Sequence, residues 1–319
     1  MADPMAALDG RALRGWTPVR IASTGNAVDW AIVDGPFTEP FFEQTADRAM
    51  RHPFNAVFAR TTPRSVLDDF ADEPGAEPAG FVFHMSRCGS TLIAQMIARL
   101  ESALVLSEAQ PFDALLRAAP ASNDRDDALL RSLRGAVRAL AANHPDRRPV
   151  VKFHAWHVLR VPALARAFPA VPWAFVFREP RAVLRSQERA PGAEVSGALD
   201  PAHLGVELDG TLQPLDSTAR VLAVFCEAAL RHAAIGRALF LDYETLPEAV
   251  FSRLLPFFGL AVSPAERDTI REVAARDPKR DGGFSAEAFP KADRRIDELA
   301  SRWLDAPYAA LRARATAGV

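Results

Sequence analysis

Gly80-Phe81-Val82-Phe83-His84-Met85-Ser86-Arg87-Cys88-Gly89-Ser90-Thr91-Leu92 is the stretch that decides the fold. Its first half is apolar, as in a buried strand, and a short polar loop follows. Apolar residues then recur at helical spacing, as Leu92, Ile93, Met96, Ile97 and Leu100. The backbone N–H groups of residues 87–91 would lie unpaired at the helix N-terminus, where the dipole favours an anion. The stretch therefore predicts a strand, a phosphate-binding loop and a helix.

The loop departs from the nucleotide-hydrolase pattern G-x-x-x-x-G-K-[ST] at two positions. His84 replaces the first glycine, and Ser90 replaces the lysine that holds the β- and γ-phosphates. A donor with a single phosphate at this end of the nucleoside does not need that lysine, because Arg87 can supply a charge-assisted hydrogen bond. An ordinary strand-to-helix turn with an N-capping serine is the alternative explanation.

The composition is that of a globular protein. The chain has 319 residues, 49% of them hydrophobic, which is enough for one large domain or one domain plus an extension. Its 38 Lys and Arg against 40 Asp and Glu argue against a nucleic-acid partner bound by an overall basic surface. Two cysteines, Cys88 and Cys226, indicate no disulfide framework, and a cytoplasmic location is expected. No apolar stretch has the length of a signal peptide or of a membrane span.

Strand-like runs alternate with helical segments from residue 80 onward. The later runs cover residues 103–108, 150–154, 172–177 and 238–243. This order predicts an α/β fold of three layers, with a central, mostly parallel sheet flanked by helices. Residues 1–78 are expected to form an N-terminal accessory extension packed on the core, and 79–319 the main domain. Residues 190–217, rich in Gly, Pro and polar side chains, are a candidate lid or substrate loop.

A second candidate phosphate site follows the run at 172–177. The sequence Arg178-Glu179-Pro180-Arg181-Ala182-Val183-Leu184-Arg185-Ser186 places an arginine at the carboxyl end of a strand and a serine two turns into the next helix. Ligands of open α/β sheets bind at that edge. Together with the loop, this pattern resembles the sulfotransferase family, which uses 3′-phosphoadenosine-5′-phosphosulfate (PAPS) as donor and releases 3′-phosphoadenosine-5′-phosphate (PAP). The segments Tyr243-Glu244-Thr245-Leu246 and Phe257-Phe258-Gly259-Leu260 resemble two further motifs of the family.

The resemblance covers about residues 80–260 and implies a fold like that of the P-loop NTPases. It also implies which residues bind the donor. The 5′-phosphosulfate would be held by the loop, and the 3′-phosphate by Arg178 and Ser186. The segment 279–283 weakly resembles a basic loop that closes over the donor, so that Arg280 would reach the 3′-phosphate, although a charged surface turn also fits. The loop residues concerned are Arg87, Cys88, Gly89, Ser90 and Thr91. The thiol of Cys88 would be a packed small side chain, unless the helix N-terminus lowers its pKa enough to make it oxidisable.

Sulfuryl transfer needs charge stabilisation and a base for the acceptor's proton, and it does not need a metal. Besides Arg87, three residues are candidates. Lys152 and His154 alternate on one strand and so point the same way, and Lys152-Phe153-His154 resembles the K-T-H of the cytosolic branch, where the histidine is the base. Glu108 stands where the protein-tyrosine and heparan branches carry a catalytic glutamate. The loop resembles those branches more closely, which favours Glu108, but either residue can be the base.

The sequence leaves the acceptor open. A small alcohol, phenol, amine or other metabolite is expected, and a peptide or a glycan is the alternative. Neither a nucleic-acid partner nor a membrane span is expected. No metal site is predicted either. His154 and His157 are three residues apart, so on a strand they would face opposite sides, and no carboxylate cluster accompanies them. Two other functions compete with sulfuryl transfer: an ATP-dependent kinase, disfavoured by Ser90 in place of the lysine, and a nucleotide-binding member of the fold without catalysis.

Overall fold

A parallel sheet lies at the centre of the molecule. The computed structural model describes residues 10–119, 124–192, 195, 201–204, 214–275 and 293–317. Within this part of the chain, five strands hydrogen-bond in the order β5-β6-β4-β7-β8, and every neighbouring pair is parallel. The strands are β4 (Gly80–His84), β5 (Ala103–Ser107), β6 (Arg148–Lys152), β7 (Trp173–Phe177) and β8 (Ala238–Asp242). All are almost completely buried, as expected for a sheet covered on both faces.

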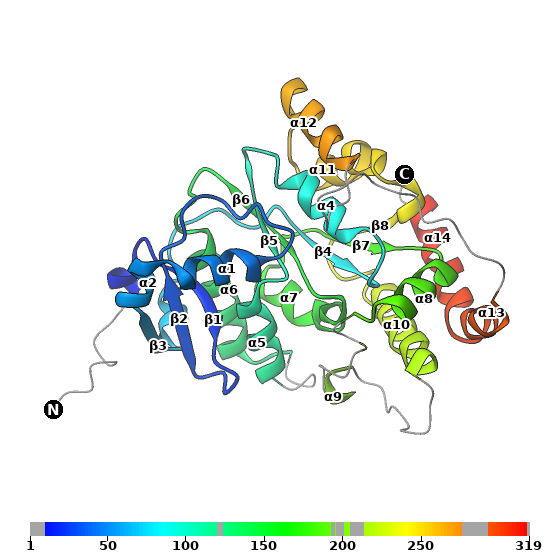
Figure 1. Cartoon of the computed structure of the whole chain (residues 1–319), viewed down its shortest axis with the longest axis horizontal. Helices are drawn as coiled ribbons and strands as arrows, with labels where there is room; N and C mark the ends of the chain where they lie inside the picture. The colour runs from blue at the N-terminus through cyan, green and yellow to red at the C-terminus, as the bar shows by residue number, and fades with distance from the viewer. Residues whose placement is uncertain are drawn as a thin grey trace.

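Helices cover both faces of this sheet (Figure 1). Helix α4 (Ser90–Ile97) lies on one face together with α12 (Pro264–Ala274), and α7 (Val161–Ala167) and α10 (Pro214–Arg231) lie on the other. The reversal of strand order between β4 and β5 requires α4 to lie opposite the later crossover helices, because βαβ crossovers are right-handed. The three-layer α/β prediction is therefore confirmed.

Other elements connect or extend the layers. They are α5 (Gln110–Ala118), α6 (Asp127–Ala141), a 3-10 helix (Ala155–Arg160), α8 (Pro180–Arg189), α9 (Pro201–Leu204), α11 (Leu255–Phe257), α13 (Arg294–Leu299) and α14 (Asp305–Ala317). Pro180 opens α8, where its missing N–H and fixed φ fit the first helical turn.

A second, antiparallel sheet comes from the N-terminal part of the chain. It has the order β1-β2-β3, with β1 (Thr17–Ile21), β2 (Ala27–Ala31) and β3 (Arg60–Pro63), and it is accompanied by α1 (Phe42–Arg51), α2 (Pro53–Val57) and α3 (Val66–Asp69). The Gln110 side chain of α5 hydrogen-bonds both backbone groups of Ile21, at 2.7 and 2.8 Å. The domain boundary at residue 78 stays a prediction.

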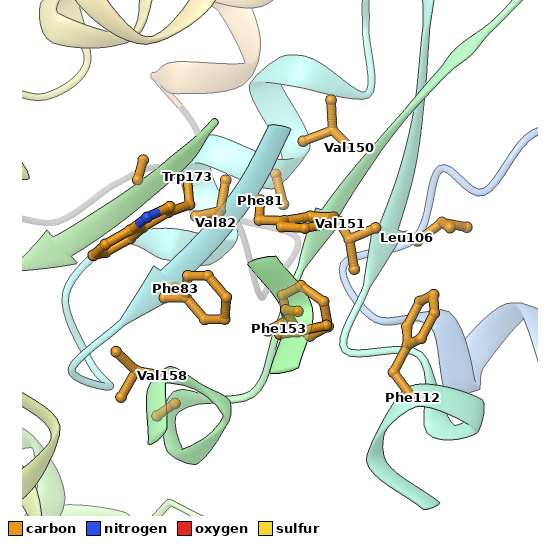
Figure 2. Packing of buried hydrophobic residues seen from close by; sticks show 14 of the residues in the cluster. Phe81, Val82, Phe83, Leu106, Phe112, Val150, Val151, Phe153, Val158 and Trp173 are labelled. Atoms are coloured by element: carbon orange, nitrogen blue, oxygen red, sulfur yellow. The ribbon is translucent and has the colours of Figure 1, made fainter. Parts of the chain in front are cut away.

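Aromatic packing fixes the end of β6 (Figure 2). The ring of Phe153, the residue after the strand, stacks on Phe83 with centroids 5.0 Å apart and meets Phe81 edge-on at 5.3 Å. Phe112 of α5 packs on its other side at 5.7 Å. Burying a ring of this size contributes about 1.5–3 kcal/mol, and offset or edge-on pairing adds to it. Phe153 therefore anchors the backbone between Lys152 and His154.

The contact between α6 and α3 leaves no room for a side chain at Gly135. A Cβ atom built there would lie 1.9 Å from the carbonyl oxygen of Leu67. We expect Gly135→Ala to lower the free energy of unfolding by about 1–3 kcal/mol, because the backbones must move apart. Urea denaturation followed by circular dichroism measures this.

The matched control is Arg131→Ala on the exposed side of the same helix. It removes only a surface ion pair with Asp72 and should change stability by less than about 1 kcal/mol. Equal stability of the Gly135→Ala variant and the parent protein would contradict the close approach of the two helices.

Candidate active site

The loop between β4 and α4 has an unusual backbone. Ser86 and Arg87 have φ values of 74° and 50°, and Gly89 has 84°. Gly89 is required at its position, because a Cβ there would lie 2.8 Å from the ring of Tyr243. Successive backbone N–H groups in a turn of this kind can point toward one concave side, which suits an anion. Ser90 and Thr91 then begin α4, with their side chains buried.

Glu108, Lys152 and His154 meet at the carboxyl edge of the sheet. Ser107 of β5 is in register with Lys152 of β6, and the next residue, Glu108, turns with a φ of 54°. One Glu108 oxygen pairs with the Lys152 ammonium, and the other lies 3.1 Å from His154 Nδ1. The Lys152 side chain is only 2% exposed, against 27% for His154. The structure thus brings the three predicted residues together as one cluster.

The charges in this cluster stabilise one another. Burial on its own would raise the pKa of Glu108, but the charges of Lys152 and His154 outweigh it and hold that pKa well below the usual range. Burial works to lower the pKa of His154, yet the neighbouring Glu108 carboxylate raises it above its ordinary value of 6.5. At neutral pH, Glu108 is therefore an anion, and His154 holds its proton more tightly than a free histidine.

A second histidine lies next to His154. The two rings of His154 and His157 are 5.4 Å apart, so the prediction that they face opposite sides was wrong. The strand ends at Lys152, and residues 155–160 form a 3-10 helix, in which positions three apart lie over one another. His157 Nε2 lies 3.2 Å from an oxygen of Asp113, while burial lowers the His157 pKa to about 4.

The candidate 3′-phosphate residues lie on and beside α8. The Arg178 guanidinium stacks 4.3 Å over the Tyr243 ring and donates a hydrogen bond of 3.3 Å to the backbone oxygen of Arg87. Arg178 is thus in direct contact with the loop, and Ser186 is half-buried in α8. Arg280 lies outside the described residues, as do 193–194, 196–200 and 205–213 of the expected substrate loop.

No protein-family model matches the chain, and no curated protein matches it in sequence. Several solved structures do match it in fold. Sulfotransferase STF9 from Mycobacterium avium is 14% identical, with 82% of each chain covered and a TM-score of 0.50. Sulfotransferase STF1 from Mycobacterium tuberculosis is 13% identical, covering 76% of this chain and 82% of that one, with a TM-score of 0.47. Mouse sulfotransferase SULT7A1, solved with PAP, is 15% identical, covering 79% and 92%, with a TM-score of 0.42.

The chain has the sulfotransferase fold. The resemblance of its motifs to that family is confirmed at this level. At 14% identity the likeness concerns the fold alone, so the roles of individual residues in this sulfotransferase fold remain predictions. Arg87 is half-buried, and its guanidinium donates a hydrogen bond to the backbone oxygen of Ala190, the residue that follows α8.

Several residues of the site were not among the predicted ones. The ring of Phe41, from the N-terminal part, lies 5.2 Å from the Lys152 ammonium. Gln187 of α8 donates a 3.0 Å hydrogen bond to the Ser86 hydroxyl. Asp113 accepts from Trp156 Nε1 at 3.0 Å. Of these residues, only Asp113 could have been expected near the site from sequence, because it lies one turn into the helix that follows Glu108. The positions of Phe41 and Gln187 depend on tertiary structure.

The described residues show neither a metal site nor a membrane-spanning helix. They contain no group of three or more His, Cys, Asp or Glu side chains that could hold a metal ion. Within the same part of the chain, no helix combines the length and hydrophobicity that crossing a bilayer requires.

Both cysteines of the chain should be inert in the native protein. Cys88 is fully buried and its thiol donates to the Val176 oxygen at 3.1 Å. Burial raises its pKa to about 12 and also raises that of the buried Cys226, so the nucleophilic thiolate is scarce. We expect no reaction with a thiol-specific chromogenic disulfide at neutral pH, and reaction of two thiols after unfolding in guanidinium chloride. Rapid native labelling that Cys88→Ser removes would contradict the burial of this side chain.

Proposed function

We propose that the protein is a sulfotransferase that moves a sulfuryl group from PAPS to a hydroxyl or amine of a small-molecule acceptor. One observation carries the proposal. The cluster of Glu108, Lys152 and His154 and the loop after β4 lie at the carboxyl ends of adjacent strands, β5, β6 and β4. Ligands of open α/β sheets bind at this edge. A phosphorylated donor in the loop would therefore have a charged acid–base group beside it.

The loop supports donor binding through its geometry. A turn with left-handed residues at Ser86, Arg87 and Gly89 can direct backbone N–H groups to one side, and the N-terminus of α4 adds a favourable dipole. We assign the 5′ end of PAPS to Arg87, Cys88, Gly89, Ser90 and Thr91, with Cys88 contributing its backbone N–H because its thiol is engaged with Val176. The donor supplies the activated sulfuryl group, and the chain supplies positive charge and N–H donors around it.

Arg178 and Ser186 are assigned to the 3′-phosphate. The guanidinium of Arg178 keeps a fixed orientation through its stack on Tyr243 and its hydrogen bond to the loop backbone. A planar guanidinium held in this way can offer parallel N–H donors to phosphate oxygens. Because the same arginine contacts the loop, the two ends of the donor would be bound by connected parts of the protein.

The two candidate bases act together in this proposal. Glu108 accepts the Nδ1–H of His154 at 3.1 Å, which fixes the tautomer whose Nε2 carries the lone pair. Nε2 then takes the proton from the acceptor, while Glu108 stabilises the imidazolium that forms. Lys152 keeps Glu108 ionised and offers positive charge to the transferring group. In this proposal Glu108 orients the His154 ring and stabilises its positive charge, and His154 accepts the proton.

Binding of PAP tests the donor. We expect calorimetry to show binding of PAP by the parent protein, with no comparable binding of ATP and Mg²⁺. Arg178→Ala should weaken PAP binding about 10- to 100-fold, the effect of losing charged hydrogen bonds. Arg189→Ala, at the exposed end of α8, is the control and should leave PAP binding within about twofold. Preference for ATP would replace the proposal with a kinase, and binding of neither would contradict it.

The pH dependence tests the division of labour between His154 and Glu108. The imidazolium cannot accept a proton, so kcat/KM should fall as the pH falls through the raised pKa of His154, above 6.5. Glu108→Gln removes the carboxylate that contributes most to raising the pKa of His154. Burial and Lys152, which lower this pKa, remain, and so does the weaker raising effect of Asp113. The acid limb should therefore move to lower pH, with a rate reduced about 10- to 100-fold by loss of orientation.

His154→Gln separates the two roles further. It should lower kcat by roughly 100-fold or more and abolish the acid limb, because the titrating base is gone. Thermal denaturation of each variant identifies any general loss of stability. A His154→Gln enzyme with nearly full kcat would instead make Glu108 the base.

A further inference from the structure

His84 joins three parts of the candidate active site. It is the last residue of β4, it is 6% exposed, and it stands where a phosphate-binding loop usually has glycine. Its Nδ1 accepts a 3.0 Å hydrogen bond from the backbone N–H of Ser86, the first left-handed residue of the loop. Its Nε2 lies 3.0 Å from the backbone oxygen of Phe153 and 3.6 Å from an oxygen of Glu108.

These contacts determine the protonation of the ring. A backbone N–H can only donate, so Nδ1 must carry the lone pair. A carbonyl oxygen can only accept, so Nε2 must carry the hydrogen. His84 is therefore a neutral imidazole in the Nε2–H form, and this hydrogen also faces the Glu108 carboxylate at a distance suited to electrostatic attraction. Protonation of Nδ1 would remove the acceptor that holds the Ser86 N–H.

We propose that His84 is a positioning residue that holds the phosphate loop through Nδ1 and the end of β6 with Glu108 through Nε2. The proposal rests on the proposed function, because Glu108 and the loop matter for transfer only if the donor binds there. Neither end of the ring is assigned a direct contact with donor or acceptor. The function of His84 is to keep the donor-binding backbone and the orienting carboxylate at a fixed separation, on which transfer rates depend steeply.

Two substitutions separate the two ends of the ring. In His84→Asn the side-chain oxygen can still accept from the N–H two residues later, as in an Asx-turn, but it is too short to reach Phe153 or Glu108. In His84→Leu both contacts are lost, and the Ser86 N–H is left buried without its acceptor. The first variant keeps the loop and releases the carboxylate, whereas the second releases both.

Binding and turnover measure the two effects independently. We expect His84→Asn to bind PAP within about threefold of the parent protein and to lose about tenfold in kcat. We expect His84→Leu to lose about tenfold or more in PAP affinity as well. The proposal is overturned if His84→Asn retains full kcat, or if both variants lose PAP affinity equally. If His84 had only a structural role, both variants would lose stability, and His84→Asn would not lose kcat while keeping its affinity for PAP.

The state of the ring can be tested without any ligand. Long-range proton–nitrogen correlation spectra of protein labelled with ¹⁵N-histidine should show His84 as the neutral Nε2–H tautomer at pH 7, identified by the signals lost in His84→Asn. An imidazolium or an Nδ1–H tautomer would overturn the proposal. If the parent protein binds no PAP, the proposed function fails, while the spectra still decide whether His84 holds the Ser86 N–H.

Discussion

The buried ammonium of Lys152 is the constraint around which the site is built. It lies on β6, with β5 on one side and β4 on the other, and its side chain is almost completely shielded from water. A buried charge of this kind is tolerated only with a partner and with hydrogen bonds around it. Glu108 provides the partner by leaving β5 in a left-handed conformation, which most residues avoid. Its N–H also donates to the Lys152 backbone oxygen at 2.7 Å.

Hydrophobic packing and the N-terminal part of the chain keep this pair in place. Phe153 packs between Phe83 and Phe112 (Figure 2). This packing holds the backbone between Lys152 and His154. The segment before α1 crosses the edge of the sheet: the hydroxyl of Ser107 donates to the Pro40 oxygen at 2.8 Å, and Phe41 covers the ammonium. The N-terminal part therefore contributes directly to the surroundings of Glu108, Lys152 and His154.

Much of the fold could be predicted from local pattern, and much of the site could not. The five parallel strands are apolar runs separated by helical periodicity, and each was predicted within a few residues of its position. The polar strand β3, Arg60–Pro63, carries no such pattern and was missed, because pairing with β2 rather than its composition makes it a strand. The grouping of Glu108 with His154 could be expected from the strand ends, but not the 3.1 Å contact that makes them partners. The positions of side chains beyond the end of a strand were the least predictable, as the neighbouring rings of His154 and His157 show.

The position of the lysine explains how the loop and the cluster complement each other. In the nucleotide-hydrolase loop the ammonium comes from the helix start, beside the β- and γ-phosphates. Here Ser90 occupies that position, and a buried lysine comes from the neighbouring strand, where it is paired with Glu108. The lysine ammonium therefore lies near the proposed base, at the end of a strand, and not beside a chain of phosphates at the start of the helix. This arrangement is consistent with the proposed donor, which has one phosphate at this end and would direct its transferable group toward His154.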